Sequence, residues 1–250
     1  MIPSDPRLQA AVQSAIGTVK KTVAEAAERV VESLGLSSLT SASNKQKQAF
    51  NDAQYELRRK LSTLQSVFDE SLRESVANEL AGRDASGPRN AATDWQSLSL
   101  VDDREVEEQV AGDRIAQAIG HECEWELREL AGYMGSLLQR NQAEPRRNPV
   151  RPEVLGRALY RGIEAVSDKE EIRSLIAKEL GQTVARAMRA CYTHMVADLQ
   201  NRGVQPAGLT VKQTAVSGMG ELSAEPETTA PTPVPVPLTP RIDPQRQASR

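Results

Sequence analysis

The sequence predicts an all-α fold: an elongated bundle of about five helices that is followed by a disordered, proline-rich tail. Over several long segments the apolar residues recur every three or four positions, which is the period of an amphipathic helix. Aromatic residues make up only 3% of the 250 residues, whereas β-sandwiches and barrels draw more heavily on aromatic and β-branched side chains. Seven of the fourteen prolines lie between Pro226 and Pro244, which excludes regular helices and strands from that stretch.

The first helix is expected to begin with Asp5 as its N-cap and Pro6 in its first turn, where a missing N–H costs nothing. Its end is expected at Leu34, with Gly35 in the left-handed C-cap conformation, and residues 36–43, rich in serine and threonine, are expected to form a loop. The apolar seam of this helix alternates steps of four and three residues: Val12, Ile16, Val19, Val23, Ala26 and Val30. We expect the seam to pack inside the bundle; the alternative is that it pairs with another chain.

A second helix is expected over residues 44–81, where apolar residues again recur every three or four positions and Gly82 provides the stop. Residues 82–101 are then expected to form a linker. Its last part, residues 95–101, has the sequence WQSLSLV, which is too short for a long helix and too apolar for free coil. We expect this strip to dock onto the bundle.

Three further helices are expected in the second half of the chain. The third covers residues 102–140, and four glycines in it predict a kink or a close helix contact: Gly112, Gly120, Gly132 and Gly135. Pro152 opens the fourth helix, which runs to about residue 166. The fifth begins at a capping box formed by Ser167 and Glu170 and ends near residue 202.

This pattern divides the chain into four parts: an N-terminal helix pair (1–81), a linker with the docked strip (82–101), a C-terminal three-helix set (102–203) and a disordered tail (204–250). The tail contains the run TTAPTPVPVPLTP, which buries too little apolar surface to offset the entropy of ordering. Such a tail is typical of a linker, and a docking motif for a partner is the alternative. Because a linker normally joins two domains, we expect the chain to be the N-terminal part of a longer protein.

Two segments resemble a known family. Residues 98–119 read LSLVDDREVEEQVAGDRIAQAI and residues 148–159 read NPVRPEVLGRAL. Both are similar to a proteobacterial family of large helical proteins known as a domain of unknown function, number 1631. The resemblance covers roughly residues 44–202. It implies a bacterial origin and a helical fold, and it supplies no active site.

Metal-binding and catalytic constellations are not expected. The two histidines and two cysteines form two pairs, His121 with Cys123 and Cys191 with His194. Residues two apart on a helix point about 200° away from each other, so the first pair cannot hold one ion. Cys191 lies on an apolar stripe, where a free cysteine acts as a small hydrophobic residue. Since the chain also lacks a nucleophile elbow, a P-loop and a dinucleotide-binding motif, we expect no cofactor, no metal and no catalytic residue, and lean against an enzyme.

Composition limits the kinds of partner. The formal net charge is -3, which argues against a dedicated nucleic-acid binder. No apolar run approaches the roughly 20 residues of a membrane-spanning helix. With only two cysteines and no signal-like N-terminus, the protein is expected in a reducing cytoplasm.

Charge is segregated along the chain. Residues 102–129 carry a net charge of -7 and residues 140–161 a net charge of +4. The two segments either pair across the fold or offer complementary surfaces to two copies of the chain. Three arginines, Arg146, Arg147 and Arg151, lie just before the helix that starts at Pro152 and are the candidate site for an anion.

The leading functional hypothesis is a non-catalytic helical scaffold or regulatory module that works through a protein partner or through self-association. Amphipathic helices, segregated charge and the flexible tail favour it. The alternative is a module that binds an anion or a nucleotide through Arg146, Arg147 and Arg151.

Overall fold

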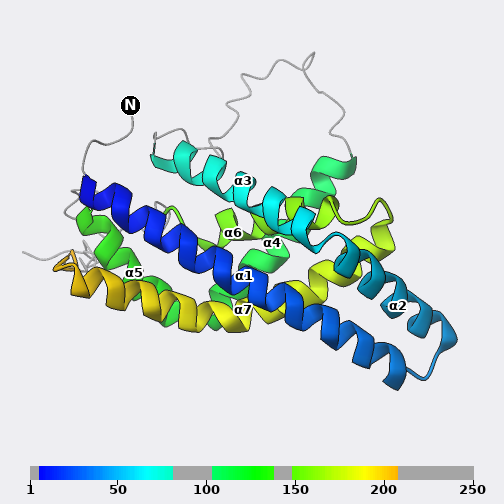
Figure 1. Cartoon of the computed structure of the whole chain (residues 1–250). Helices are drawn as coiled ribbons and strands as arrows, with labels where there is room; N and C mark the ends of the chain where they lie inside the picture. Colours follow the sequence, from blue (N-terminus) through cyan, green and yellow to red (C-terminus); the bar gives the residue numbers. More distant parts are fainter. Residues whose placement is uncertain (1–5, 81–102, 138–147, 208–250) are drawn as a thin grey trace, which may run out of the picture. The chain divides into compact units, whose positions relative to one another are not determined.

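The computed structural model describes residues 6–80, 103–137 and 148–207, and it is all-α over these residues, as predicted (Figure 1). Its helices are α1 (Pro6–Thr40), α2 (Asn44–Arg59), α3 (Leu61–Leu80), α4 (Asp103–Glu122), α5 (Glu124–Leu137), α6 (Pro152–Glu164) and α7 (Glu170–Asn201). The strip at 95–101, Arg146, Arg147 and the proline-rich tail lie outside the described residues. None of the described helices combines the length and the apolar content that a membrane crossing requires.

The described helices number seven rather than about five, because two of the expected helices are each divided at one residue. Lys60 separates α2 from α3 with φ -110° and ψ 21°, and Cys123 separates α4 from α5. Helical hydrogen bonds continue through both positions: the amide of Leu64 donates to the carbonyl of Lys60 at 2.9 Å, and that of Leu127 to Cys123 at 2.9 Å. A one-residue irregularity leaves the spacing of the apolar residues unchanged, so periodicity alone cannot detect it.

Helix α1 continues to Thr40, so the expected stop at Gly35 is wrong, and the loop expected over 36–43 is confined to residues 41–43. Hydroxyl groups in this stretch donate to carbonyls one turn back, as Ser38 does to Gly35 at 2.7 Å and Ser41 to Ser37 at 2.6 Å. Such bonds let a serine-rich segment remain helical. Gly35 instead provides room for Gln54 of α2, whose amide donates to the carbonyl of Val31 at 3.0 Å.

The start of α7 also differs from expectation. The N-cap is Lys169, and no side chain caps the helix. Ser167 accepts a hydrogen bond from the amide of Lys169 at 3.3 Å, so its hydroxyl stabilises the turn before the helix. The capping box that the sequence pattern predicts is therefore not formed.

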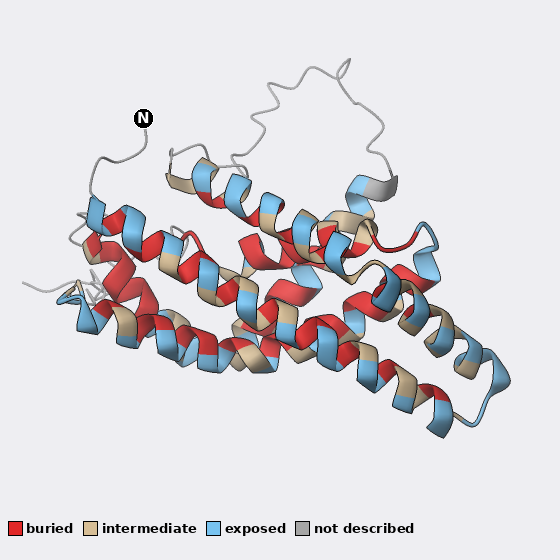
Figure 2. Cartoon of the chain, viewed as in Figure 1, coloured by how far each residue is buried: buried red, intermediate tan, exposed pale blue. Residues whose placement is uncertain are grey.

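The seam of α1 packs inside the fold. Its six residues, from Val12 to Val30, are at most 4% exposed, and they form the buried stripe along α1 in Figure 2. Ser14 of α1 donates to Asp198 of α7 at 2.9 Å, and the two helices lie against each other. The seam thus contacts the chain's own core, which decides between the two alternatives for this helix. One hydrophobic core draws residues from both the expected N-terminal pair and the expected C-terminal set, while the proposed division at 82–101 stays a prediction.

Helix α6 lies at the centre of this core, in contact with α3, α4 and α7. Eight of its thirteen residues are buried. Two glycines allow its neighbours to approach closely. A Cβ atom at Gly156 would collide with the carbonyl oxygen of Gly112 and lie 3.0 Å from the amide nitrogen of Ala116, both in α4. A Cβ atom at Gly162 would lie 3.0 Å from the carbonyl oxygen of Leu64 in α3.

Replacing Gly156 with alanine should therefore destabilise the protein. The added methyl group has to push α4 away from α6, which costs about 1–3 kcal/mol in a well-packed core. The matched control is Gly17→Ala in α1, where no atom lies within 4 Å of the new methyl group and alanine should stabilise the helix by about 0.5–1 kcal/mol. Urea unfolding followed by circular dichroism measures both. Equal effects of the two substitutions would show that the α4–α6 contact tolerates a side chain.

Candidate functional site

Arg151 is the one candidate anion-binding residue that the structure describes, and it is already engaged by a carboxylate. It is the N-cap residue of α6. Its guanidinium donates to Glu79 of α3 at 2.7 Å, and the two side chains are only 13% and 6% exposed. A second contact, at 3.6 Å, joins it to Glu153. In this arrangement Arg151 ties α6 to α3, and the anion site with Arg146 and Arg147 stays a prediction.

A buried polar cluster joins α4, α6 and α7. Arg173 of α7 donates to both carboxylate oxygens of Glu107 in α4, at 3.2 and 2.6 Å. It also donates to the backbone carbonyls of Ser167, at 3.5 Å, and Asp168, at 2.9 Å. Tyr160 of α6 donates its hydroxyl to Glu107 at 2.5 Å. We call Glu107, Tyr160 and Arg173 the α4–α6–α7 cluster.

The pKa shifts in the α4–α6–α7 cluster favour a structural role for its side chains over a role in proton transfer. Burial, and then the hydrogen bond to Glu107, raise the pKa of Tyr160, so its hydroxyl keeps the proton that it donates. The hydrogen bonds that Arg173 itself donates to Glu107 are the main cause that raises the pKa of Arg173. Tyr160 and Arg173 donate hydrogen bonds and Glu107 accepts them. The three side chains thereby hold α4, α6 and α7 together.

The segregated charge of the sequence is paired inside the fold. Arg161 of α6 donates to Glu108 of α4 at 2.8 Å, and it also lies 3.8 Å from Glu74 of α3. With the Glu107–Arg173 pair, these contacts connect the acidic segment to basic residues of the helices that it packs against. Pairing across the fold is therefore realised for these residues. The sequence interpretation identified the charged segments but missed the α4–α6–α7 cluster. The available signal was the adjacent pair Glu107 and Glu108, about one helical turn before Gly112.

Both cysteines are buried and free. Cys123 donates its thiol to the carbonyl of Ala185 at 3.6 Å. Burial raises the pKa of Cys123 to about 12 and that of Cys191 to about 11. Thiols with such values are protonated at neutral pH and are poor nucleophiles. His121 is exposed while Cys123 is buried, so the two side chains point to opposite faces of the helix, as their spacing predicts.

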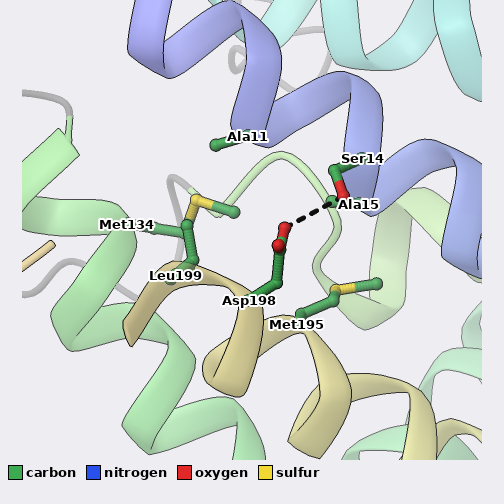
Figure 3. A pocket seen from close by; sticks show the side chains of 7 residues that line it. All are labelled: Ala11, Ser14, Ala15, Met134, Met195, Asp198 and Leu199. Carbon is green, nitrogen blue, oxygen red and sulfur yellow. Dashed lines mark hydrogen bonds between the residues drawn. The ribbon is translucent and has the colours of Figure 1, made fainter. Parts of the chain in front are cut away.

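A small hollow lies between α1, α5 and α7 (Figure 3). Its lining is Ala11, Ser14, Ala15, Met134, Met195, Asp198 and Leu199. The Asp198 carboxylate is held there by Ser14, at 2.9 Å, and by Arg202, at 2.9 Å. The hydrogen bond from Arg202 is the largest cause that lowers the pKa of Asp198. The hollow has room for no more than a water-sized molecule.

The outer surface carries large apolar side chains. Among the described residues, those that are 44–78% exposed are Leu36, Leu39, Tyr55, Val106, Val110 and Trp125. Trp125 of α5 is 74% exposed and lies two residues from both Cys123 and Leu127, on the opposite side of the helix from the core. The guanidinium of Arg128 lies 5.1 Å from the ring centroid of Trp125. The sequence interpretation did not single out Trp125, although its position off the apolar stripe was a usable signal.

Comparison with known proteins gives one match. The sequence model of a family described as "Protein of unknown function (DUF1631) N-terminal domain" matches residues 5–203. No curated protein and no solved structure matches the chain. The family is the one that the two sequence segments resemble, and the match extends to α1, which the resemblance did not cover.

Changing Tyr160 to phenylalanine should destabilise the protein more than the same change at Tyr192. The hydroxyl of Tyr160 is bonded to the charged Glu107, and removing such a bond costs about 1.5–3 kcal/mol. Tyr192 is equally buried but donates to a neutral carbonyl, that of Val150, at 3.0 Å, where the cost is about 0.5–1.5 kcal/mol. Unfolding free energies of the two variants test the comparison. A larger effect at Tyr192 would contradict the role given to the cluster.

Stability should fall as the pH rises from about 9 to about 11. In the unfolded chain both thiols ionise near their ordinary pKa of 9.0, while in the folded chain Cys123 and Cys191 stay protonated to about 12 and 11. The unfolded state therefore releases protons first and is favoured, by up to about 1.4 kcal/mol per pH unit for each thiol. Urea unfolding across this range should show a shallower decline for Cys191→Ala. An unchanged decline in that variant would rule out a contribution from Cys191.

Proposed function

The chain belongs to the DUF1631 N-terminal domain family, and from that premise we propose that it is a non-catalytic helical module that works as a scaffold or regulator through protein contacts. The proposal extends to its setting, the cytoplasm of a bacterial cell. Two free, buried cysteines, Cys123 and Cys191, are compatible with a reducing compartment.

The exposed Trp125 is the observation that carries the proposal. Tryptophan and arginine are over-represented among the residues that contribute most to protein interfaces. Here the two occur together, with Arg128 over the indole ring and held by Glu124 at 3.0 Å. A ring fixed in this way loses little conformational freedom when a partner covers it. The exposed apolar area therefore favours a protein surface as the ligand.

The polar groups of the interior also support the proposal of a non-catalytic module. Glu107, Tyr160 and Arg173 bind one another, and Arg151 binds Glu79. These groups stabilise the helix packing, and the two thiols have raised pKa values. Anion binding through Arg146, Arg147 and Arg151 would require Arg151 to turn away from Glu79, which makes it the less favoured alternative.

Changing Trp125 to alanine should abolish capture of the partner. The tagged full chain is used to recover partners from the bacterial lysate, with and without a chemical cross-linker. Loss of a tryptophan at the centre of an interface costs at least about 2 kcal/mol, so recovery should fall more than about tenfold. Gln117→Ala, on the exposed side of α4, is the control and should leave recovery unchanged. Partners recovered equally by the Trp125→Ala chain, or none recovered by the wild type, would count against this function.

A further inference from the structure

The hairpin formed by α1 and α2 has an outer surface that the rest of the fold leaves exposed (Figure 2). On α1, Glu28, Glu32 and Leu39 lie about 160–180° around the helix from the buried Val30. On α2, Tyr55 is two residues from both Ala53 and Leu57, which are fully buried, and so points away from the core. We call this surface the hairpin face.

The hairpin face has an acidic row on α1 and a basic row on α2. The acidic row holds Glu25, Glu28 and Glu32, all exposed, with Arg29 as its one basic member. The basic row holds the exposed Arg58 and Arg59. Among the described residues, Glu28, Glu32 and Arg58 make no ion pair. These three charges are therefore not neutralised within the fold. Glu25 pairs with Arg29 at 3.8 Å, and Arg59 pairs with Glu56 at 3.6 Å, both at the exposed surface.

Apolar side chains accompany both rows. Leu36 and Leu39 of α1 are 65% and 78% exposed, and Tyr55 of α2 is 64% exposed. Arg59 lies 5.8 Å from the ring centroid of Tyr55. Exposed leucines and a tyrosine beside charged rows give the composition of an interface: apolar groups that gain from burial and charges that select the partner.

The two rows lie level with each other along the hairpin. Gln54 of α2 contacts Gly35 and donates to the carbonyl of Val31 at 3.0 Å. Because α1 and α2 run in opposite directions, Glu32 lies near the level of Tyr55, and Glu28 near that of Arg58. A two-fold axis parallel to the helices would then set the acidic row of one hairpin against the basic row of another, twice and in register.

We propose that the hairpin face binds a second copy of this chain, with α1 and α2 of each copy forming an antiparallel four-helix contact. This proposal rests on the proposed function and names one of the partners. Each acidic row meets a basic row, and Leu36, Leu39 and Tyr55 are removed from water. The match is isologous, so the contact closes as a dimer and does not extend into a filament.

The test uses two charge-reversal variants of the full chain. Glu28→Lys, Glu32→Lys makes both rows basic, and Arg58→Glu, Arg59→Glu makes both rows acidic. The wild type should have twice the 27.3 kDa chain mass in light scattering over a dilution series. Each variant alone should dimerise at least about a hundredfold more weakly, because like charges then face each other. A mixture of the two should form mixed dimers, since each basic row again meets an acidic one.

The control is Glu70→Lys on α3 with Asp113→Lys on α4, both exposed, which changes the net charge by the same amount as Glu28→Lys, Glu32→Lys and should leave the dimer intact. All four residues of the reversal variants are exposed, and circular dichroism should show unchanged folding. A wild-type monomer at every concentration, variants that do not combine in the mixture, or a control that dissociates would each overturn the dimer. A monomer that still captures a partner through Trp125 would leave the interaction module in place and remove only this contact.

Discussion

The close approach of α4 and α6 is the constraint on which the rest of the structure depends. Gly156 lies against Gly112 and Ala116 with no room for a side chain. The helices cross there in opposite directions, so one turn farther along, Glu107 and Glu108 of α4 come level with Tyr160 and Arg161 of α6. The hydrogen bond from Tyr160 to Glu107 and the ion pair between Arg161 and Glu108 both follow from this one register. Arg173 then joins α7 to the same carboxylate.

Polar and apolar groups are distributed differently in the interior and on the surface of the described residues. In the interior, Glu107, Tyr160 and Arg173 bind one another, and the raised pKa values of Tyr160, Cys123 and Cys191 keep their protons in place. The surface has the opposite character, with exposed leucine, tyrosine and tryptophan side chains beside charged groups. Burying an ion pair gains little net energy, but it fixes geometry. Here it fixes the positions of α3, α4, α6 and α7.

The sequence alone predicted the helical class, most helix positions and the burial of the α1 seam, because apolar spacing reports directly on one buried face. It did not predict the breaks at Lys60 and Cys123, which leave that spacing intact. It also placed the end of α1 at Gly35, since a glycine near a helix end usually serves as a cap; the need for space beside Gln54 comes from tertiary packing. The charge segments at 102–129 and 140–161 were visible, but their pairing depends on helix register. Arg151 was chosen for its position before α6, and its partner Glu79 lies 72 residues away, where no local pattern could find it.

The burial of α6 has a consequence for how the chain folds. A helix of 13 residues is too short to be stable by itself in water. Its helical structure therefore forms in the same step as its packing against α7, which follows it directly, and against α3 and α4, which come from more distant parts of the sequence. Those long-range contacts must close costly loops before they stabilise anything, which slows folding. Once formed, the backbone amides of α6 exchange with solvent only when the whole core opens.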